Sequence, residues 1–262
     1  LPDHSFRQPF EVPLGDVVID ATTHVRLTAP DGTVRDLKLG QEFQPIRRGA
    51  NGHASGGLVF LGYGIRSDEF QFDEFAKIDV AGKVVVVIRR EPQSYDGGAF
   101  QGTVTSPNAY IDRKLELMKL AQAAAVLFVN DFSSSPTEQT DDLATPSSFG
   151  NDGDSLPFAH VRQSVVDRIL SSTPLTTQDG SSLSSLRAVA KYIDTNLKPV
   201  SQELQGWTAD VTTKFQANTV TAYNLIGVIE GDGPNADQTI VIGGHYDHLG
   251  FGGFGSMSPN RK

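Results

Sequence analysis

The segments Val84–Ile88 (VVVVI) and Ala125–Val129 (AVLFV) are unbroken apolar runs of strand length. Such runs, rich in β-branched residues, are typical of strands that are buried on both faces of a sheet. The stretch 111–124 lies between them and predicts a helix, because its apolar residues recur at helical spacing (Ile111, Leu115, Met118). A strand, a helix and a second strand in this order predict a crossover unit.

The preceding chain predicts extended structure. Residues 23–28 and 34–39 alternate in polarity around the turn signal Pro30-Asp31-Gly32, which predicts a β-hairpin. Residues 48–57 are polar and rich in glycine, so we expect a loop and a domain boundary there. A short strand is expected at 58–61. The acidic segment 67–78 is expected to lie at the surface, with three aromatic anchors (Phe70, Phe72, Phe75).

The following chain alternates between loops and regular elements. Residues 131–156 are polar and predict a solvated loop. The expected strands after it are 157–161, 208–215, 223–229 and 239–242, and the last two are expected to pair antiparallel through a short turn-rich linker. Residues 183–197 carry the clearest helical stripe. A shorter helix is expected at 165–170, with Ser164 as its cap.

Composition excludes several classes of function. The chain has 262 residues and a formal net charge of −9, which argues against a nucleic-acid partner and against an anchor on an anionic membrane. No apolar run approaches the roughly 18 residues that a membrane span requires. The absence of cysteine excludes disulfides, thiolate metal sites and cysteine nucleophiles. The first ten residues carry no signal-peptide pattern.

The segment that most strongly indicates a functional site is Gly243-Gly244-His245-Tyr246-Asp247-His248-Leu249-Gly250. Residues two apart in an extended chain point to the same side, so His245 and Asp247 can face one site. Imidazole is a good Zn²⁺ ligand, and a carboxylate can orient it from its other nitrogen. The alternative is a histidine and an aspartate that satisfy hydrogen bonds in a loop, and this tripeptide alone favours the alternative.

Other candidate sites carry weaker signals. No nucleophile elbow and no P-loop occur in the sequence. The carboxylate pairs Asp73-Glu74 and Asp141-Asp142 have no nearby histidine, so we expect solvated surfaces. The segment 151–154 lacks the carboxylate spacing of a calcium loop. Three further histidines stand alone in the sequence (His24, His53, His160), and for each we expect a surface or satisfied core role.

Two sets of motifs resemble known families. The segments 224–231 (NLIGVIEG) and 240–250 (IVIGGHYDHLG) resemble the start of a family M28 zinc aminopeptidase domain. The middle of the chain resembles the protease-associated (PA) domain that is often inserted in such enzymes. The segments that carry this second resemblance are 59–65 (VFLGYGI), 78–86 (IDVAGKVVV), 123–130 (AAAVLFVN) and 156–161 (LPFAHV).

The resemblance implies a metallo-aminopeptidase that removes residues from peptide N-termini with water activated by two zinc ions. The residue that matches a zinc ligand is His245, and Asp247 matches the aspartate that orients it. The remaining metal ligands and the glutamate base of the family are expected beyond Lys262. We therefore expect the chain to correspond to a fragment, inactive as a peptidase by itself and binding zinc weakly or not at all.

The expected fold is mixed α/β. Residues 50–172 are expected to form the PA domain, a β-rich sandwich or open barrel with short flanking helices. Residues 1–49, an extended segment with a hairpin, are expected to pack with 173–262, the start of an incomplete α/β zinc-peptidase domain. The expected partners are peptide substrates and contacts through the PA domain or an exposed peptidase sheet. Relatives of this architecture are commonly exported, which implies an extracytoplasmic location.

Two alternatives remain open at this point. The first is a non-catalytic PA-type module for protein interaction or substrate recognition, in which the His245 segment is vestigial. The second is a lone α/β binding protein, which requires the PA resemblance to be accidental.

Overall fold

The computed structural model describes residues 5–95, 97–102, 104–146 and 156–246. The fold is mixed α/β and rich in sheet, as the sequence predicts. The chain divides into two compact units, one made of residues 1–12 and 221–262 and the other of residues 13–220. The boundaries 1–49, 50–172 and 173–262 expected from the sequence stay a prediction.

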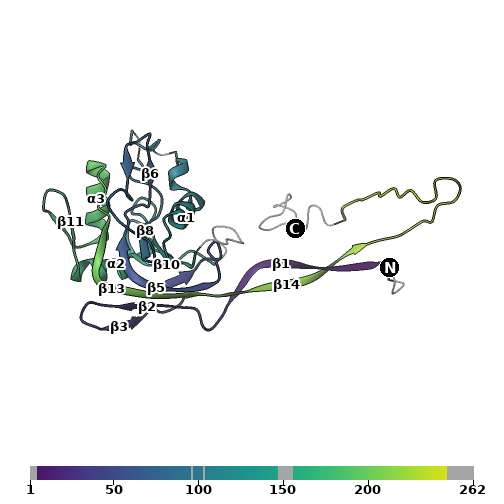
Figure 1. The fold of residues 1–262 in the computed structure, drawn as a ribbon, viewed down its shortest axis with the longest axis horizontal. Helices are drawn as coiled ribbons and strands as arrows, with labels where there is room; N and C mark the ends of the chain where they lie inside the picture. The colour runs from purple at the N-terminus through teal and green to yellow at the C-terminus, as the bar shows by residue number, and fades with distance from the viewer. Residues whose placement is uncertain (1–4, 96, 103, 147–155, 247–262) are drawn as a thin grey trace. The chain divides into compact units, whose positions relative to one another are not determined.

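The larger unit is built on one eight-stranded sheet (Figure 1). Its strands lie in the order β3 (Val34–Asp36), β2 (His24–Thr28), β13 (Gln202–Thr213), β5 (Gly52–Phe60), β8 (Val84–Ile88), β9 (Ala125–Val129), β10 (Phe158–Val161) and β4 (Phe43–Pro45). The four strands from β5 to β10 are parallel to one another, and the outer pairings are antiparallel.

The crossover predicted from the two apolar runs is confirmed. Strands β8 and β9 pair in parallel, with Val86 opposite Leu127, and α1 (Ile111–Leu120) connects them. The helix ends at Leu120 rather than at residue 124. Gln122 adopts a left-handed backbone, with φ +59°, and the Ala124 N–H already donates to the Lys83 carbonyl, so the chain has joined the sheet by then.

The central strands separate two apolar cores because successive side chains point to opposite faces. One face carries Phe60, Val84 and Val86, and it packs against α2 (Gln163–Ser172) and α3 (Leu186–Asn196). The other face carries Val85 and Val87, and it packs against α1. Figure 1 shows α1 and α3 on opposite sides of the sheet. Every residue of β8 and β9 is buried, which explains why these strands do not alternate in polarity.

The predicted hairpin is confirmed, since β2 and β3 pair antiparallel with Thr28 opposite Val34. The predicted loop at 48–57 is wrong in its second half, where β5 begins at Gly52. These residues pair with β13 through their backbone, from Gly52 opposite Thr213 to Gly57 opposite Thr208. Strand β13 begins at Gln202, six residues before the predicted start, and its pairing is irregular between Glu203 and Thr208. The local sequence does not predict this pairing, because it depends on backbone groups of residues that are distant in the sequence.

The predicted helix starts need correction. Helix α2 begins at Gln163 with Arg162 at the N-cap and no side-chain cap, so Ser164 is not its cap. Helix α3 begins at Leu186, where Ser185 accepts the Ala188 N–H. It starts later than predicted because β12 (Ser182–Leu183) pairs with β11 (Leu175–Thr176). The remaining short elements are β6 (Arg66–Ser67), β7 (Phe72–Asp73), η1 (Pro107–Ala109) and η2 (Glu138–Thr140).

Two of the three expected aromatic anchors are fully buried. Phe72 and Phe75 lie in the two cores, and Phe70 is half-buried against the first of them. None of the helices in the described part of the chain is long and apolar enough to cross a membrane.

A two-stranded sheet of β1 (Arg7–Ile19) and β14 (Phe215–Leu225) reaches into the smaller unit. Glu11 contacts Thr221 and Gln8 contacts Asn224, so the strands run antiparallel. The predicted pairing of 223–229 with 239–242 is wrong: β14 ends at Leu225, and residues 239–242 form no strand. Strand β14 has β1 as its partner instead. Apolar side chains after it are exposed, as Ile229 (98%) and Ile242 (94%) illustrate.

Candidate functional site

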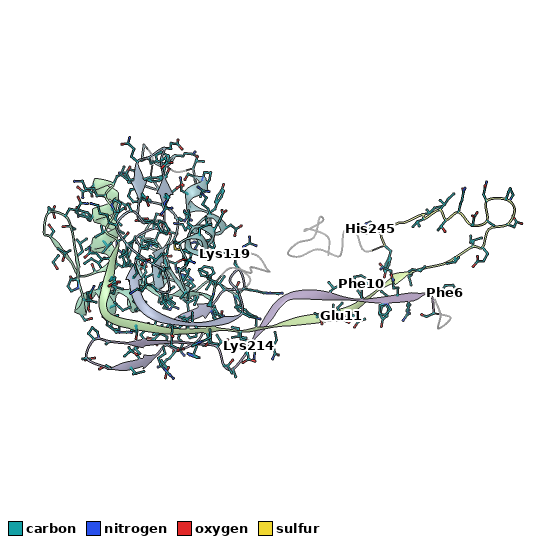
Figure 2. All side chains as sticks on the ribbon, viewed as in Figure 1. Phe6, Phe10, Glu11, Lys119, Lys214 and His245 are labelled. Carbon is teal, nitrogen blue, oxygen red and sulfur yellow. The ribbon has the colours of Figure 1, made fainter. Side chains whose placement is uncertain are left out.

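The predicted zinc ligand His245 lies in the smaller unit, in an exposed segment that is not part of a strand. The neighbouring Tyr246 hydroxyl donates to the Tyr223 carbonyl at 2.7 Å, which ties this segment to β14. Figure 2 labels His245 with Phe6 and Phe10 of the same unit. Asp247 falls outside the described residues, so its predicted role in orienting His245 stays a prediction.

The described residues do not assemble a metal site. No three histidine, cysteine, aspartate or glutamate side chains converge within residues 5–95, 97–102, 104–146 and 156–246. A zinc ion in a protein is held by three or four protein ligands. The structure therefore offers His245 as one potential ligand, and its metal role stays a prediction.

A second candidate site is a cavity of about 570 Å³ in the larger unit, at the carboxyl end of β8. Ligands of open α/β sheets bind at the carboxyl ends of parallel strands. Three arginines line this cavity: Arg89, Arg90 and Arg113. Its wall also includes Tyr110 and Pro107.

The local fold positions these arginines. The Arg89 N–H donates to the Val129 carbonyl at 2.8 Å, which extends the pairing of β8 with β9 by one residue. Arg90 adopts a left-handed backbone, with φ +60°, and its Nε lies 3.7 Å from the buried carboxylate of Asp131. Arg113 stands in the first turn of α1. The end of a strand and the start of the crossover helix thus bring the three side chains to one cavity.

A buried carboxylate fixes the wall of the cavity. Glu91, directly after the two arginines, accepts the Ser106 N–H at 2.8 Å and also the Ser106 hydroxyl. The Ser106 hydroxyl oxygen accepts the Asn108 N–H and caps η1, which leads into α1. Because Glu91 and Ser106 are both buried, this link joins the end of β8 to the start of the helix firmly.

The charges in the cavity are crowded. Burial has the largest effect on the pKa of Arg89 and lowers it. The positive charge of Arg90 lowers this pKa further, and the negative charge of Asp131 raises it in part. Two carboxylates also line the cavity, from Asp112 and Glu116. Asp112 is already paired with Arg48, with 2.6 Å between the Arg48 Nε and Asp112 Oδ1 atoms.

Buried charges that sequence reasoning missed support the neighbouring bend. The carboxylate of Glu74 accepts the N–H groups of Tyr63 at 3.0 Å and Ile65 at 2.9 Å, and the Lys114 ammonium donates to the Tyr63 carbonyl. Burial raises the pKa of Glu74 to about 7 and lowers that of Lys114 to about 7. The expectation that Asp73-Glu74 is solvated is wrong for Glu74, because the backbone of the bend needs buried acceptors.

The expectation for Asp141-Asp142 is likewise wrong for Asp141, which is buried. Its carboxylate accepts from Asn130 Nδ2 at 2.9 Å and from the Gln163 N–H at 2.7 Å. Burial raises the pKa of Asp141. Asp141 thus satisfies donors at the end of β9 and the start of α2, two elements that the sequence separates by more than thirty residues. No local signal in the sequence marks this role.

The isolated histidines have defined environments. Those of β2 and β5, His24 and His53, share one carboxylate of β13: their Nε2 atoms lie 2.6 and 3.0 Å from the two oxygens of Asp210. In the sheet both histidines pair with Thr212, which is two residues from Asp210 on the same face. His160 is buried in β10, and its Nδ1 accepts the Ala144 N–H at 2.9 Å.

Comparison with protein families places a PA domain in the centre of the chain. The family model of the PA domain matches residues 51–169, which confirms the PA resemblance read from the sequence. This range contains the arginine-lined cavity and the buried pair Glu74 and Lys114. No curated protein sequence matches the chain significantly.

Solved structures with a similar fold include two aminopeptidases and a protease. The aminopeptidase from Aneurinibacillus sp. strain AM-1 is 15% identical (TM-score 0.42) and covers 83% of this chain and 36% of its own. The zinc aminopeptidase from Bacillus subtilis is 14% identical (TM-score 0.38), covering 83% and 35%. The subtilisin-like protease Apa1 from an Antarctic Pseudoalteromonas sp. AS-11 is 15% identical (TM-score 0.32), covering 76% and 34%. The chain spans about a third of the length of each.

Proposed function

We propose that this chain is the PA-containing portion of a zinc-dependent aminopeptidase of the M28 type, in an extracytoplasmic location. The observation that carries the proposal is the order of two motifs: a PA domain at 51–169, followed by the segments NLIGVIEG and IVIGGHYDHLG at 224–231 and 240–250. The substrates are peptides with a free N-terminus, cleaved by water that two zinc ions activate.

In this proposal His245 supplies one imidazole ligand, and Asp247 accepts a hydrogen bond from its other ring nitrogen. The described residues do not by themselves fit a zinc pair, because no three potential ligands converge among them. We therefore derive no catalytic step through zinc. The 262-residue chain by itself is expected to show no aminopeptidase turnover and no tightly bound zinc.

The experiment that tests this proposal uses the product of the complete reading frame that contains residues 1–262. Its hydrolysis of aminoacyl-p-nitroanilides in the presence of Zn²⁺ is expected to fall at least about a hundredfold in the His245→Ala variant, since loss of one ligand disrupts the metal site. The matched control is His53→Ala, which removes an exposed imidazole from the larger unit. Unchanged turnover in His245→Ala would refute the metal role.

A second candidate function is a non-catalytic PA-type module that recognises peptides or proteins. The observation that favours it is the cavity lined by Arg89, Arg90 and Arg113, which lies inside the PA match. A complete protein that has no Zn²⁺-dependent turnover on any aminoacyl substrate, but still binds peptides, would support this function over the first.

A further inference from the structure

We propose that the cavity between the carboxyl end of β8 and the amino end of α1 binds a peptide through a carboxylate. The ligand class is a short extended peptide that bears one accessible carboxylate, either an acidic side chain or the C-terminus. This goes beyond the proposed peptidase function, because it assigns a recognition site inside the PA domain that uses none of the residues around His245.

The first argument is the concentration of guanidinium groups in an acidic chain. The chain carries a net charge of −9, yet three arginines line one cavity. Two of them are consecutive residues and the third comes from another element, so the fold brings them together across more than twenty residues. Guanidinium groups recognise carboxylates through paired N–H donors, which makes arginine suited to this role.

The second argument is the availability of Arg113. Within the described part of the chain, this guanidinium makes no hydrogen bond or ion pair, and its side chain is exposed. Among residues 5–95, 97–102, 104–146 and 156–246, the ion-pair partner of Arg90 is the Asp131 carboxylate at 3.7 Å, a distance longer than a hydrogen bond. A ligand carboxylate can therefore bind without first displacing a close internal partner of Arg113.

The third argument concerns the amino end of α1. Its N-cap residue Tyr110 offers no side-chain acceptor to the first turn. The N–H groups of a first helical turn have no partner within the helix and carry a partial positive charge. This end supports the arginines in attracting an anion, although it would not define a site without them.

The charge balance selects the kind of anion. The three arginines of the cavity lining outnumber its two carboxylates, Asp112 and Glu116, by one, so the lining carries one net positive charge. One positive charge matches a monoanionic carboxylate better than a dianionic phosphate. The overall charge of −9 disfavours a polyanion such as nucleic acid.

The dimensions and the wall fit a peptide. A volume of about 570 Å³ lies within the range of roughly 300–1,000 Å³ that is usual for ligand pockets. Tyr110 is 55% exposed, and it lines the cavity together with Pro107, so the wall offers apolar groups to a peptide side chain. The link between Glu91 and Ser106 keeps this wall in place before binding.

The test measures binding of hexapeptides to the product of the complete reading frame that contains residues 1–262, by fluorescence anisotropy at low salt. The peptides carry an uncharged BODIPY label on the N-terminus, so the label adds no carboxylate. One peptide, with the sequence Gly-Ala-Tyr-Asp-Ala-Gly, has an amidated C-terminus and carries its only carboxylate on aspartate. A second has asparagine in place of aspartate and a free C-terminus, and a third has asparagine and an amidated C-terminus. The third is expected not to bind, and comparison of the first two identifies which carboxylate is recognised.

The matched variants are Arg113→Gln and Lys191→Gln. Each removes one exposed positive charge from a helix, but Lys191 lies on α3, which packs on the opposite face of the sheet. We expect Arg113→Gln to weaken binding of the carboxylate peptide at least about tenfold, the effect of one charge-assisted hydrogen bond, and Lys191→Gln to change it less than twofold.

Two outcomes would overturn the proposal: equal binding of all three peptides, or an equal effect of the two variants. Absence of binding of every peptide at millimolar concentration would also overturn it. The two proposals are tested separately: turnover of His245→Ala in the product of the complete reading frame tests the peptidase proposal, and the comparison of Arg113→Gln with Lys191→Gln tests the cavity. A protein with turnover but no carboxylate-dependent binding would refute only the cavity proposal.

Discussion

Two apolar runs of similar composition differ in burial in this molecule. The run VVVVI of β8 is entirely buried, with Ile88 at 0% exposure, whereas the run TIVI at 239–242 is exposed, with Ile240 at 87%. Both are rich in β-branched residues, and both predict strands from the sequence alone. Only the first has strands on both sides and helices on both faces.

The difference shows what a β-branched run can and cannot specify. It favours an extended backbone, but burial needs neighbours that come from distant parts of the chain. Strand β8 has β5 and β9 at its edges and cores above and below. Within the described residues, the run at 239–242 has no paired strand.

The strongest test of this comparison substitutes one isoleucine in each run. Ile88→Ala is expected to lower the free energy of unfolding by about 2–5 kcal/mol, because it leaves a cavity in a packed core. Ile240→Ala is expected to change it by less than about 0.5 kcal/mol, since its side chain is exposed. Chemical denaturation followed by circular dichroism measures both. Equal destabilisation by the two substitutions would contradict the difference in packing.

The same contrast explains which parts of the fold the sequence predicts. The crossover of β8, α1 and β9, the hairpin and helix α3 follow from local patterns, and all are present. The first half of β5 does not follow, because it is polar and rich in glycine, and its place in the sheet depends on pairing with the distant strand β13. Where the chain pairs across 150 residues, local composition says little about the outcome.

The candidate sites also differ in whether a sequence motif marks their residues. A sequence motif marks His245, and its metal role stays a prediction. The three arginines of the cavity carry no motif, since Arg89 and Arg90 come from one strand end and Arg113 from a helix. The sequence predicts that Glu74 and Asp141 are solvated, as acidic pairs usually are, but both carboxylates are buried and accept backbone N–H groups that no local pattern marks.

The two units can also be compared through one histidine of each, His160 of the larger unit and His245 of the smaller one, by the pH dependence of stability. Burial lowers the pKa of His160 to about 4, and the positive charges of Arg89 and Arg162 add to this effect. The folded protein then leaves His160 neutral where the unfolded chain, with a pKa near 6.5, binds a proton. Stability is therefore fully present above pH 6.5 and is lost as the pH falls toward 4, by about 3 kcal/mol from this group.

The His160→Asn variant tests this linkage. Asparagine keeps an acceptor for the Ala144 N–H but cannot take up a proton, so the decline in unfolding free energy between pH 6.5 and 4 is expected to become shallower by about 3 kcal/mol. The matched control is His245→Asn, which lies in the other unit and is expected to leave that decline unchanged. Urea titrations at several pH values give both slopes. An unaltered decline in His160→Asn would mean that His160 is not the responsible group.

The smallest expected effect compares two serines that precede or begin helices. Ser185 accepts the Ala188 N–H at the start of α3, whereas Ser164, which the sequence pattern marks as a cap, lies inside α2 and is exposed. Ser185→Ala is expected to lower the free energy of unfolding by about 1 kcal/mol, because one N–H of the first turn loses its acceptor. Ser164→Ala is expected to change it by no more than a few tenths of a kcal/mol, since Ser164 caps no N–H group. Equal losses of unfolding free energy in urea denaturation would mean that Ser164 caps α2, as the sequence predicts. The local sequence pattern would then be a sufficient guide to where α2 begins.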